Sequence, residues 1–367
     1  GGLMIDLSDM NTVRVDTAAK TARADGGCLE GHIDIEAALV GMATTGGIVS
    51  HTGAGGLTLG GGFGRLCRKL GMACDNFIGA DIVTVDGKLR HVSDEEDPDL
   101  MWALRGGGSN FGVVTALEYQ LHRQDPMVIA GDINFAGDDV RKALLWYGEH
   151  GNDIPDELNL NTIVIAPPDV GLMVSFEAVW CGDPKQADKA LAPLRAVGKP
   201  IVDTVAPARY AKFQQRLDNS NRHGVRLYMK SSFVNDFSEE LVDEMLDMHR
   251  RTPIYAIFLM QSGGAVNRRS PSDTAFPHRS ALFNMMVWNQ WKDLETPDQR
   301  EERISQVRAD WKRVEKFTHG YYVNLNDEDQ AKTNANYGDN YARLVRIKDR
   351  YDPGNLMRLN ANIQPSA

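Results

Sequence analysis

The sequence lacks several features that would assign it at once to a class of protein. Four of its 367 residues are cysteine, and no two of them stand in a Cys-x-x-Cys pair. This excludes a dense disulfide framework of the secreted type, and we expect four buried or half-buried thiols in a reducing compartment. No run of apolar residues approaches the roughly 18 that a membrane-spanning helix needs. We therefore expect a soluble protein with no membrane partner.

Basic residues are also in short supply. Forty lysines and arginines stand against fifty aspartates and glutamates, which gives a net charge of −10. A negative field of this size repels phosphate backbones and no basic stripe opposes it, so we expect no nucleic-acid partner. Histidine, cysteine and carboxylate residues do not occur at metal-ligand spacings, so we expect no metal site.

The chain is longer than one hydrophobic core usually serves, which favours two domains or more. Residues 1–125 are rich in glycine and in short β-type runs, and they predict a strand-rich α+β lobe. From about residue 126 the pattern changes to strands mixed with longer amphipathic helices. The predicted strands are 3–7, 13–15, 82–85, 113–121, 128–135, 163–179, 254–261 and 282–288. The predicted helices are 33–42, 98–104, 138–147, 185–197, 238–250 and 297–316.

A run of glycines is the most informative segment. Residues 53–64 read GAGGLTLGGGFG, which is seven glycines in twelve positions. Glycine loses more backbone entropy on folding than any other residue, so such a run is costly without a use. Bare peptide groups can lie against a flat or phosphate-bearing ligand, and the run therefore predicts an extended loop along a cofactor. A plain cluster of turns between strands is the alternative.

The run does not match the common nucleotide-binding motifs. No Gly-Lys-Ser/Thr follows it, so it is not a Walker loop, and a nucleotide-binding transferase would lack the lysine that it needs. The dinucleotide fingerprint, in which the glycines follow a strand and open a helix, does not fit either. Glycine density alone therefore indicates a nearby cofactor without naming it.

Other segments accompany the run in a fixed order. They are GMACDN at 71–76, DIVTVDG at 81–87, DLMWALRGGGSNFGVVT at 99–115 and YDPGNLMRLNANIQP at 351–365. In this order and spacing the chain resembles the FAD-linked oxidases of the vanillyl-alcohol oxidase superfamily, most closely the berberine-bridge-enzyme-like group and its bacterial relatives. The resemblance covers nearly the whole chain and is strongest over 1–125 and 320–367.

The resemblance implies a fold and a division into domains. In this family the flavin lies between two halves of an FAD-binding domain of the PCMH type, and its ring faces a separate substrate domain. We therefore expect an α+β protein with an N-terminally incomplete FAD-binding domain at 1–125. A substrate-binding domain, with an antiparallel sheet flanked by helices, is expected at 126–319, and residues 320–367 are expected to return to the FAD domain.

The resemblance also implies FAD as the cofactor and assigns residues to it. The residues expected to line the cofactor are Thr52, Gly53, Gly55, Gly56, Gly60, Gly61 and Gly64. Val113 and Val114 match the place where family members present backbone to the adenine end of FAD. Asn360 matches an amide near the flavin pyrimidine edge, where it can donate and accept hydrogen bonds together, with a loop cap as the alternative.

A covalent link to FAD is a further family feature. Relatives commonly use a histidine in an Arg-Gly-Gly-Gly-His loop that lies upstream of the match to Gly1, so a histidyl link is expected only through a residue before Gly1. The chain is accordingly expected to be a fragment or an incomplete gene product. Where doubly linked relatives carry a cysteine, this sequence has Val49, so no cysteinyl link is expected. A cytoplasmic location is expected, and an upstream targeting segment stays open because the chain starts with glycine rather than methionine.

The implied reaction is that of an FAD-dependent oxidase. A hydride would pass from a small alcohol, sugar hemiacetal or cyclic amine to flavin N5, with O2 as acceptor, while a base takes the substrate proton. Thr52 has nearly the shape of the valine that accompanies oxidase activity in plant relatives. The family's Tyr-x-Asn-Tyr segment is Tyr322-Val323-Asn324-Leu325 here, so Tyr322 and Asn324 are the predicted catalytic residues. A core aromatic role for Tyr322 is the alternative.

Departures from the family pattern leave a second hypothesis open. Leu325 replaces the second tyrosine, and Asn284 and Met286 stand where relatives offer lysine or glutamine, so we expect a less polar pocket. The alternative function is therefore a truncated, non-catalytic flavin-fold protein that binds a ligand without turnover. His278 and Arg279 are expected to form a structural turn. The sequence does not indicate an oligomeric state.

Overall fold

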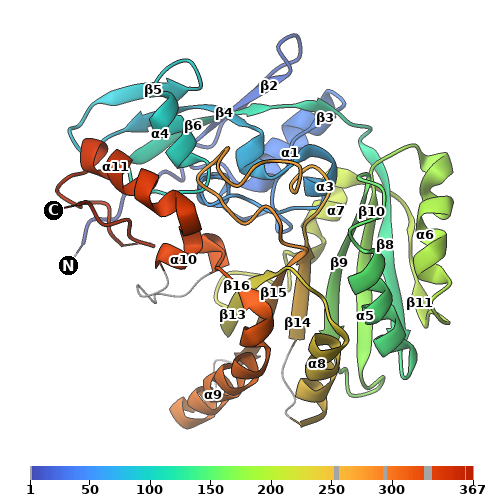
Figure 1. Ribbon diagram of the computed structural model, residues 1–367. Coiled ribbons are helices and arrows are strands. Elements are labelled where there is room, and N and C mark those ends of the chain that lie inside the picture. The colour runs from blue at the N-terminus through green and yellow to red at the C-terminus, as the bar shows by residue number, and fades with distance from the viewer. Residues whose placement is uncertain (1, 252–255, 292–295, 326–332, 360, 367) are drawn as a thin grey trace.

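The computed structural model describes residues 2–251, 256–291, 296–325, 333–359 and 361–366. It contains two large antiparallel sheets, each covered by helices, and it confirms the predicted α+β class (Figure 1). The first sheet uses residues from 13 to 120 and the second uses residues from 127 to 319. Domain boundaries at residues 125 and 319 stay a prediction.

The first sheet forms the frame of the N-terminal lobe. In spatial order its strands are β1 (Val13–Asp16), β2 (Thr21–Asp25), β6 (Val113–Gln120), β4 (Phe77–Val83) and β5 (Leu89–Ser93). The helices of this lobe are α1 (Glu30–Leu39), α2 (Ala54–Leu59), α3 (Cys67–Leu70) and α4 (Pro98–Leu104), and a small ladder joins β3 (Met42–Ala43) to β7 (His122–Arg123). The predicted strand at 3–7 is wrong. In the described part of the chain no strand pairs with these residues, and Leu3 is 85% exposed.

The second sheet is larger. In spatial order its strands are β11 (Val202–Asp203), β8 (Met127–Ala136), β10 (Met173–Trp180), β9 (Leu158–Ile165), β14 (Ala256–Gln261), β15 (Phe283–Trp291), β13 (Arg226–Val234) and β16 (Thr318–His319), with β12 (Ala206–Arg209) beside β8. The predicted strand at 163–179 is two strands, because Pro167 and Pro168 between them cannot donate ladder hydrogen bonds. The helices of this lobe are α5 (Asp139–His150), α6 (Ala187–Arg195), α7 (Tyr210–Phe213), α8 (Glu239–Arg251) and α9 (Pro297–Val314).

One face of the second sheet is covered by helices and the other is not. Helices α5, α6, α8 and α9 pack on the outer face and form the core of this lobe with it (Figure 1). Successive side chains of a strand point to opposite faces. Val164 and Met285 therefore enter the helix-covered core, whereas their neighbours Ile163 and Met286 reach the opposite face. The strand alternation thus reserves one face of the sheet for a ligand.

The C-terminal segment returns to the first lobe. Helix α10 (Thr333–Tyr337) precedes α11 (Tyr341–Tyr351), and α11 lies beside α4 (Figure 1). Leu344 and Ile347 join the core of the first lobe. The backbone N–H of Ile363 donates to Asn110 Oδ1 over 3.0 Å, which ties the tail to the loop after α4. Helix α11 and Ile363 therefore pack with the N-terminal lobe, and the return of the whole segment 320–367 to it stays a prediction.

The cysteines behave as buried thiols. Cys28, Cys67, Cys74 and Cys181 are all buried and none is in a disulfide, as expected from the sequence. Burial raises the pKa of the Cys67 thiol to about 11 and that of Cys74 to about 12, so both are neutral near pH 7.

Among the described helices, none is both long and apolar enough to cross a bilayer.

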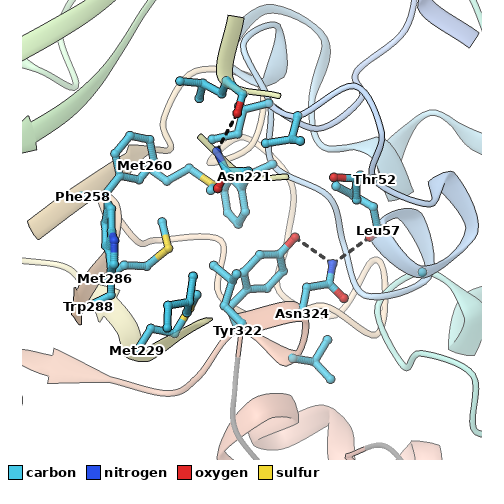
Figure 2. A pocket seen from close by; sticks show the side chains of 18 of the residues that line it. Thr52, Leu57, Asn221, Met229, Phe258, Met260, Met286, Trp288, Tyr322 and Asn324 are labelled. Carbon is cyan, nitrogen blue, oxygen red and sulfur yellow. Dashed lines mark hydrogen bonds between the residues drawn. The ribbon is translucent and has the colours of Figure 1, made fainter. Parts of the chain in front are cut away.

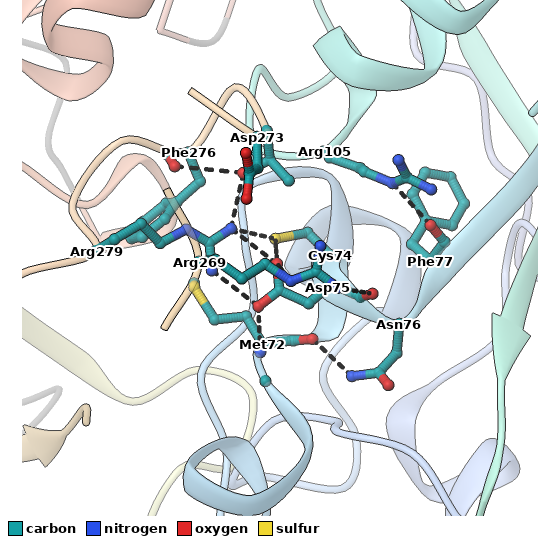
Figure 3. A network of polar contacts seen from close by, with 12 residues as sticks. Met72, Cys74, Asp75, Asn76, Phe77, Arg105, Arg269, Asp273, Phe276 and Arg279 are labelled. Atoms are coloured by element: carbon teal, nitrogen blue, oxygen red, sulfur yellow. Dashed lines mark hydrogen bonds and ion pairs between the residues drawn. The ribbon is translucent and has the colours of Figure 1, made fainter. Parts of the chain in front are cut away.

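A buried ion pair connects the two lobes. Arg279, in the loop between β14 and β15, donates through Nη1 and Nη2 to the two carboxylate oxygens of Asp75, each over 2.8 Å (Figure 3). Both side chains are 1% exposed. Arg279 Nη2 also donates to Thr274 Oγ1 over 2.7 Å. The turn at 278–279 therefore has the structural role that the sequence predicted.

Loss of Arg279 should destabilise the protein strongly. In an Arg279→Met variant the Asp75 carboxylate stays buried without its main counter-charge, and we expect the free energy of unfolding to fall by about 3–5 kcal/mol. Guanidinium unfolding followed by circular dichroism measures this loss. Arg269 provides the control, since its Nε lies 3.5 Å from Asp75 and its side chain is 45% exposed. Arg269→Met should cost less than about 1 kcal/mol, and equal losses in both variants would contradict the assignment.

Candidate functional site

A cavity of about 1280 Å³ lies between the two lobes and the C-terminal segment. The first lobe contributes Thr52, Gly53, Gly56 and the segment 108–110 to its wall, and the tail contributes residues 358, 359 and 361. The helix-free face of the second sheet forms much of the remaining wall, together with residues of the segments 216–221, 322–325 and 333–336. Small-molecule pockets usually measure about 300–1,000 Å³. This cavity therefore has room for a large ligand with a smaller one beside it.

Part of the glycine run faces this cavity. Gly53 and Gly56 line it, and a Cβ built at either position would meet no described atom within 4 Å. The predicted extended loop is wrong over this part of the run, because Ala54–Leu59 forms helix α2 with Gly53 at its N-cap. Open space still lies beside both glycines in this short helix, so bare backbone faces the cavity at these two positions, and its contact with a ligand stays a prediction.

The other predicted glycines do not line the cavity; they are Gly55, Gly60, Gly61 and Gly64. Close packing within the protein requires a bare backbone at Gly60, Gly61 and Gly64, whereas a Cβ at Gly55 would make only ordinary contacts, the nearest at 3.6 Å. A Cβ at Gly60 would lie 1.9 Å from Asn324 Oδ1, and a Cβ at Gly64 would lie 1.8 Å from the carbonyl oxygen of Gly46. No real Cβ approaches another atom so closely, so a side chain at either position would push the packed segments apart.

Three further residues are predicted from the sequence to bind the cofactor. Val113 and Val114 lie in β6, where they pair with Val83 and Ile82 of β4, and neither lines the cavity. Asn360 lies outside the described residues. The roles assigned to all three stay predictions.

The sequence prediction missed the segment Gly108-Ser109-Asn110, which lines the cavity. Gly108 has φ +70°, a left-handed conformation that favours glycine. Asn110 Nδ2 donates to the carbonyl oxygens of Gly107, over 2.8 Å, and of Ala361, over 3.1 Å. The three consecutive glycines at 106–108 carried the same signal as the run at 53–64.

Tyr322 and Asn324, the two predicted catalytic residues, both line the cavity and contact one another (Figure 2). The Tyr322 hydroxyl oxygen accepts hydrogen bonds from the Gly62 backbone N–H and from Asn324 Nδ2, each over 2.9 Å. Asn324 Nδ2 also donates to the carbonyl oxygen of Leu57 over 2.9 Å. Burial raises the pKa of Tyr322 to about 12, although hydrogen bonds from Asn324, Gly62 and Phe63 lower it. Tyr322 is therefore neutral near pH 7.

Apolar side chains of the second sheet face these two residues (Figure 2). They come from β13, β14 and β15 and include Met229, Phe258, Met260, Met286 and Trp288. Of the two positions singled out in the sequence, Met286 lines the cavity, whereas Asn284 is fully buried outside its wall. The wall opposite Tyr322 is accordingly formed mainly by thioether and aromatic groups.

Charged side chains line the cavity on the other half of the sheet, at β8 and β10. Asp132 and Glu177 lie on these strands, and Arg216 reaches them from the 3-10 helix η3 (Gln214–Leu217). Burial disfavours ionisation of Glu177, but the positive charges of Arg65 and Arg216 outweigh it and hold the pKa of this carboxyl below its ordinary value. Glu177 is therefore ionised near pH 7. No local pattern in the sequence indicated this cluster.

Comparison with known proteins gives consistent matches. A family model described as an FAD binding domain matches residues 1–93, and one described as berberine and berberine like matches residues 321–364. The chain is 32% identical to an FAD-linked oxidoreductase of Dictyostelium discoideum, with 99% of this chain and 80% of the relative covered. It is 30% identical to (R)-6-hydroxynicotine oxidase of Paenarthrobacter nicotinovorans, over 100% and 82% of the two chains. A solved structure of a chitooligosaccharide oxidase aligns with a TM-score of 0.87 at 27% identity, over 100% and 82%.

The residues of the cavity fit FAD. Gly53 and Gly56 leave free the space that side chains would fill, and the wall formed by 108–110 lies on the same cavity. The volume is sufficient for this large cofactor together with a small substrate. We therefore predict that FAD lies on the glycine side of the cavity and that the substrate lies against the exposed face of the second sheet.

Filling the space beside α2 should weaken FAD binding without unfolding the protein. Leucine at position 56 favours a helix over glycine by about 1 kcal/mol, so Gly56→Leu should fold. We expect its affinity for FAD to fall at least about tenfold, which is about 1.4 kcal/mol. Flavin absorbance per protein after buffer exchange, and release of fluorescent FAD on dilution, measure this loss.

Gly354 provides a matched control for this variant. A Cβ there also meets no described atom within 4 Å, but the residue does not line the cavity. Gly354→Leu should retain the flavin content of the parent protein. Equal flavin loss in the two variants, or none in Gly56→Leu, would argue against the assigned cofactor wall.

Proposed function

The chain belongs to the FAD-linked oxidoreductases of the berberine-bridge-enzyme-like group, and we propose that Tyr322 is the catalytic group with which it oxidises a small alcohol, sugar hemiacetal or cyclic amine. The family, the PCMH-type fold, the cofactor FAD and the FAD-dependent oxidase activity expected from the ordered motifs are all confirmed. The observation that carries the proposal is the meeting of the Tyr322 hydroxyl and the Asn324 amide in the cavity.

Oxidation of such a substrate needs an electron acceptor and a base. Bound FAD supplies the two-electron acceptor, which none of the ordinary side chains of the cavity can provide. Tyr322 is proposed to take the proton of the substrate O–H or N–H. The Gly62 N–H and Asn324 Nδ2 point at its oxygen, and both stabilise the phenolate, the minor form near pH 7 that can accept the proton.

The surroundings of Tyr322 hold its ring in one orientation. The rings of Phe63 and Tyr322 pack edge to face with centroids 5.4 Å apart, and Phe276 packs against Tyr322 in the same manner at 6.2 Å. Asn324 is fixed in turn by its hydrogen bond to Leu57. The proposed base is thereby positioned before the substrate arrives, which lowers the cost of reaching a reactive geometry.

O2 is proposed as the final electron acceptor. Relatives of the chain are named oxidases, and Thr52, the residue whose shape suggested oxygen access, lines the cavity beside Gly53. These relatives are named for hydroxynicotine and for chitooligosaccharide, so their names leave the substrate class open. The alternative of a flavin-fold protein without turnover is not favoured, because the relatives are oxidases and Tyr322 is in place.

Removal of the Tyr322 hydroxyl should slow the reductive step. With a substrate found in a panel of alcohols, sugars and cyclic amines, we expect Tyr322→Phe to lower the rate of anaerobic flavin reduction by about 10²–10⁴-fold. Stopped-flow absorbance measures this rate. Because burial raises the pKa of Tyr322 to about 12, the parent rate should increase with pH by about tenfold per unit through the neutral and alkaline range. The variant should lose this dependence.

Tyr337 offers a control for the loss of a buried hydroxyl. Its side chain is 1% exposed, its hydroxyl donates to the Gly107 carbonyl, and it does not line the cavity. Tyr337→Phe should keep the parent rate and pH profile. A Tyr322→Phe enzyme with the parent rate and profile would refute the proposed base.

A further inference from the structure

We propose that Glu177, held in place by Arg65, selects the substrate, and that the substrate is a compact apolar ring compound with an N–H or O–H donor rather than an oligosaccharide. This inference rests on the proposed function and concerns the substrate side of the same cavity. It follows from two groups of side chains on the exposed face of the second sheet. One group is charged and lies on β8 and β10, and the other is apolar and lies mainly on β13, β14 and β15.

Glu177 is fixed by a two-point contact. Arg65 Nε lies 2.8 Å from Oε1 of Glu177, and Arg65 Nη2 lies 2.9 Å from Oε2. The Arg65 side chain is fully buried, and that of Glu177 is 11% exposed. Parallel hydrogen bonds of this kind set both the position and the plane of a carboxylate. The remaining exposed edge of Glu177 therefore faces the cavity in a defined orientation.

Arg65 is itself held by hydrogen bonds to residues other than Glu177. Its Nη1 donates to the Ile48 carbonyl over 3.0 Å and to Gln214 Oε1 over 2.7 Å. Gln214 Nε2 then donates to the Gly47 carbonyl over 2.8 Å and to Asp34 Oδ2 over 3.1 Å. The three links of Gln214 are buried and the link to Ile48 is partly buried, so they hold the arginine, and with it Glu177, in place. The carboxylate is a prepared acceptor rather than a mobile side chain.

Glu177 retains capacity to accept a hydrogen bond. A carboxylate has about four lone-pair sites. Arg65 uses two of them, and Asn161 Nδ2 donates to a third, on Oε1, over a long 3.5 Å. Arg216 Nη1 lies 3.3 Å from Oε2 as an ion pair and not as a hydrogen bond, so one site on Oε2 is left. A ligand group that only accepts hydrogen bonds would face an anion without compensation, whereas an N–H or O–H would satisfy the free site.

The charges of the cluster argue against an anionic substrate. Arg65 and Arg216 are two cations, and Glu177 and Asp132 are two carboxylates paired with them. A substrate carboxylate would meet no uncompensated cation in this cluster, and its desolvation would cost free energy. A neutral or cationic donor group is therefore the better match to this side of the cavity.

The apolar group of side chains determines which substrate skeleton fits the cavity. Its members that carry no N–H or O–H include Ile163, Met229, Phe258 and Met286. An oligosaccharide would bury hydroxyl groups against them without partners, at a cost of roughly 1–3 kcal/mol for each. Methionine is unbranched and adapts to irregular apolar shapes, and it makes favourable contacts with aromatic rings. These surroundings suit a hydrocarbon or aromatic ring.

The experiment compares ligands of one shape with and without the donor. We would titrate the holoenzyme, reduced with dithionite so that no ligand is oxidised, with 2-phenylpyrrolidine, 1-phenylethanol, 2-phenyltetrahydrofuran and cellobiose, using calorimetry. The parent enzyme should bind the amine and the alcohol at least about tenfold more tightly than 2-phenyltetrahydrofuran. Cellobiose should bind most weakly. The amine and alcohol arms separate an N–H donor from an O–H donor.

Two variants then test Glu177 itself. Glu177→Gln should lose at least about tenfold of the preference for the donor ligands while 2-phenyltetrahydrofuran binds as before. Because this variant leaves Arg65 buried without its full counter-charge, the Arg65→Met/Glu177→Leu double variant removes both charges, an exchange that folds well for many buried pairs. It should show no preference for the donor. Glu118→Gln is the control, since Glu118 pairs with Arg23 over 2.7 Å away from the cavity, and it should behave as the parent.

Several outcomes would overturn the inference. They are tighter binding of cellobiose than of the aryl ligands, a parent enzyme that binds none of the aryl ligands, or a donor preference that survives in the double variant. Flavin reduction by the donor ligands in the oxidised holoenzyme is measured separately. Donor preference without any flavin reduction would refute the proposed function and support this inference, whereas reduction without preference would do the reverse.

Discussion

The arrangement of the two lobes depends on buried charges carried by one short segment. Arg65, Arg68 and Asp75 lie within eleven positions of one another in the first lobe, and each makes its buried contact with the second lobe. Asp75 pairs with Arg279 and Arg65 pairs with Glu177. Buried charges are costly unless their partners are complete and well placed, so these contacts permit one relative placement of the lobes. The cavity lies between the lobes, so its shape depends on how the lobes are placed relative to one another.

The glycine run serves this same contact as well as the ligand. Gly53 and Gly56 leave space beside the cavity, whereas Gly60 leaves space for Asn324. The close approach at Gly60 and the N–H of Gly62 together hold the hydroxyl of Tyr322. A segment with side chains at these positions would separate the lobes and withdraw the hydrogen-bond donor. Glycine density therefore reflects both an open stretch of the cavity wall and close packing of the two lobes next to the proposed base.

The two faces of the second sheet have different roles. The helix-covered face contributes to a continuous apolar core, and the opposite face carries side chains that line the cavity. Because neighbouring residues of a strand point to opposite faces, Met286 can change the pocket while Met285 keeps the core. The same alternation places Glu177 towards the cavity while Phe176 and Ala178 enter the core. Such a sheet can change its substrate preference through few residues, as fold and function are separable.

The sequence by itself determined what short-range pattern and ordered motifs encode. Residues 98–104 form α4 as expected, and the motif order indicated the family, the cofactor and the pair Tyr322 and Asn324. Tertiary structure alone decided that Gly60 and Gly64 face protein, and that Arg65 meets Glu177 from 112 positions away. Local periodicity specifies which face a residue takes in its own helix or strand. It does not specify which distant residue lies opposite, because that depends on how the two lobes pack.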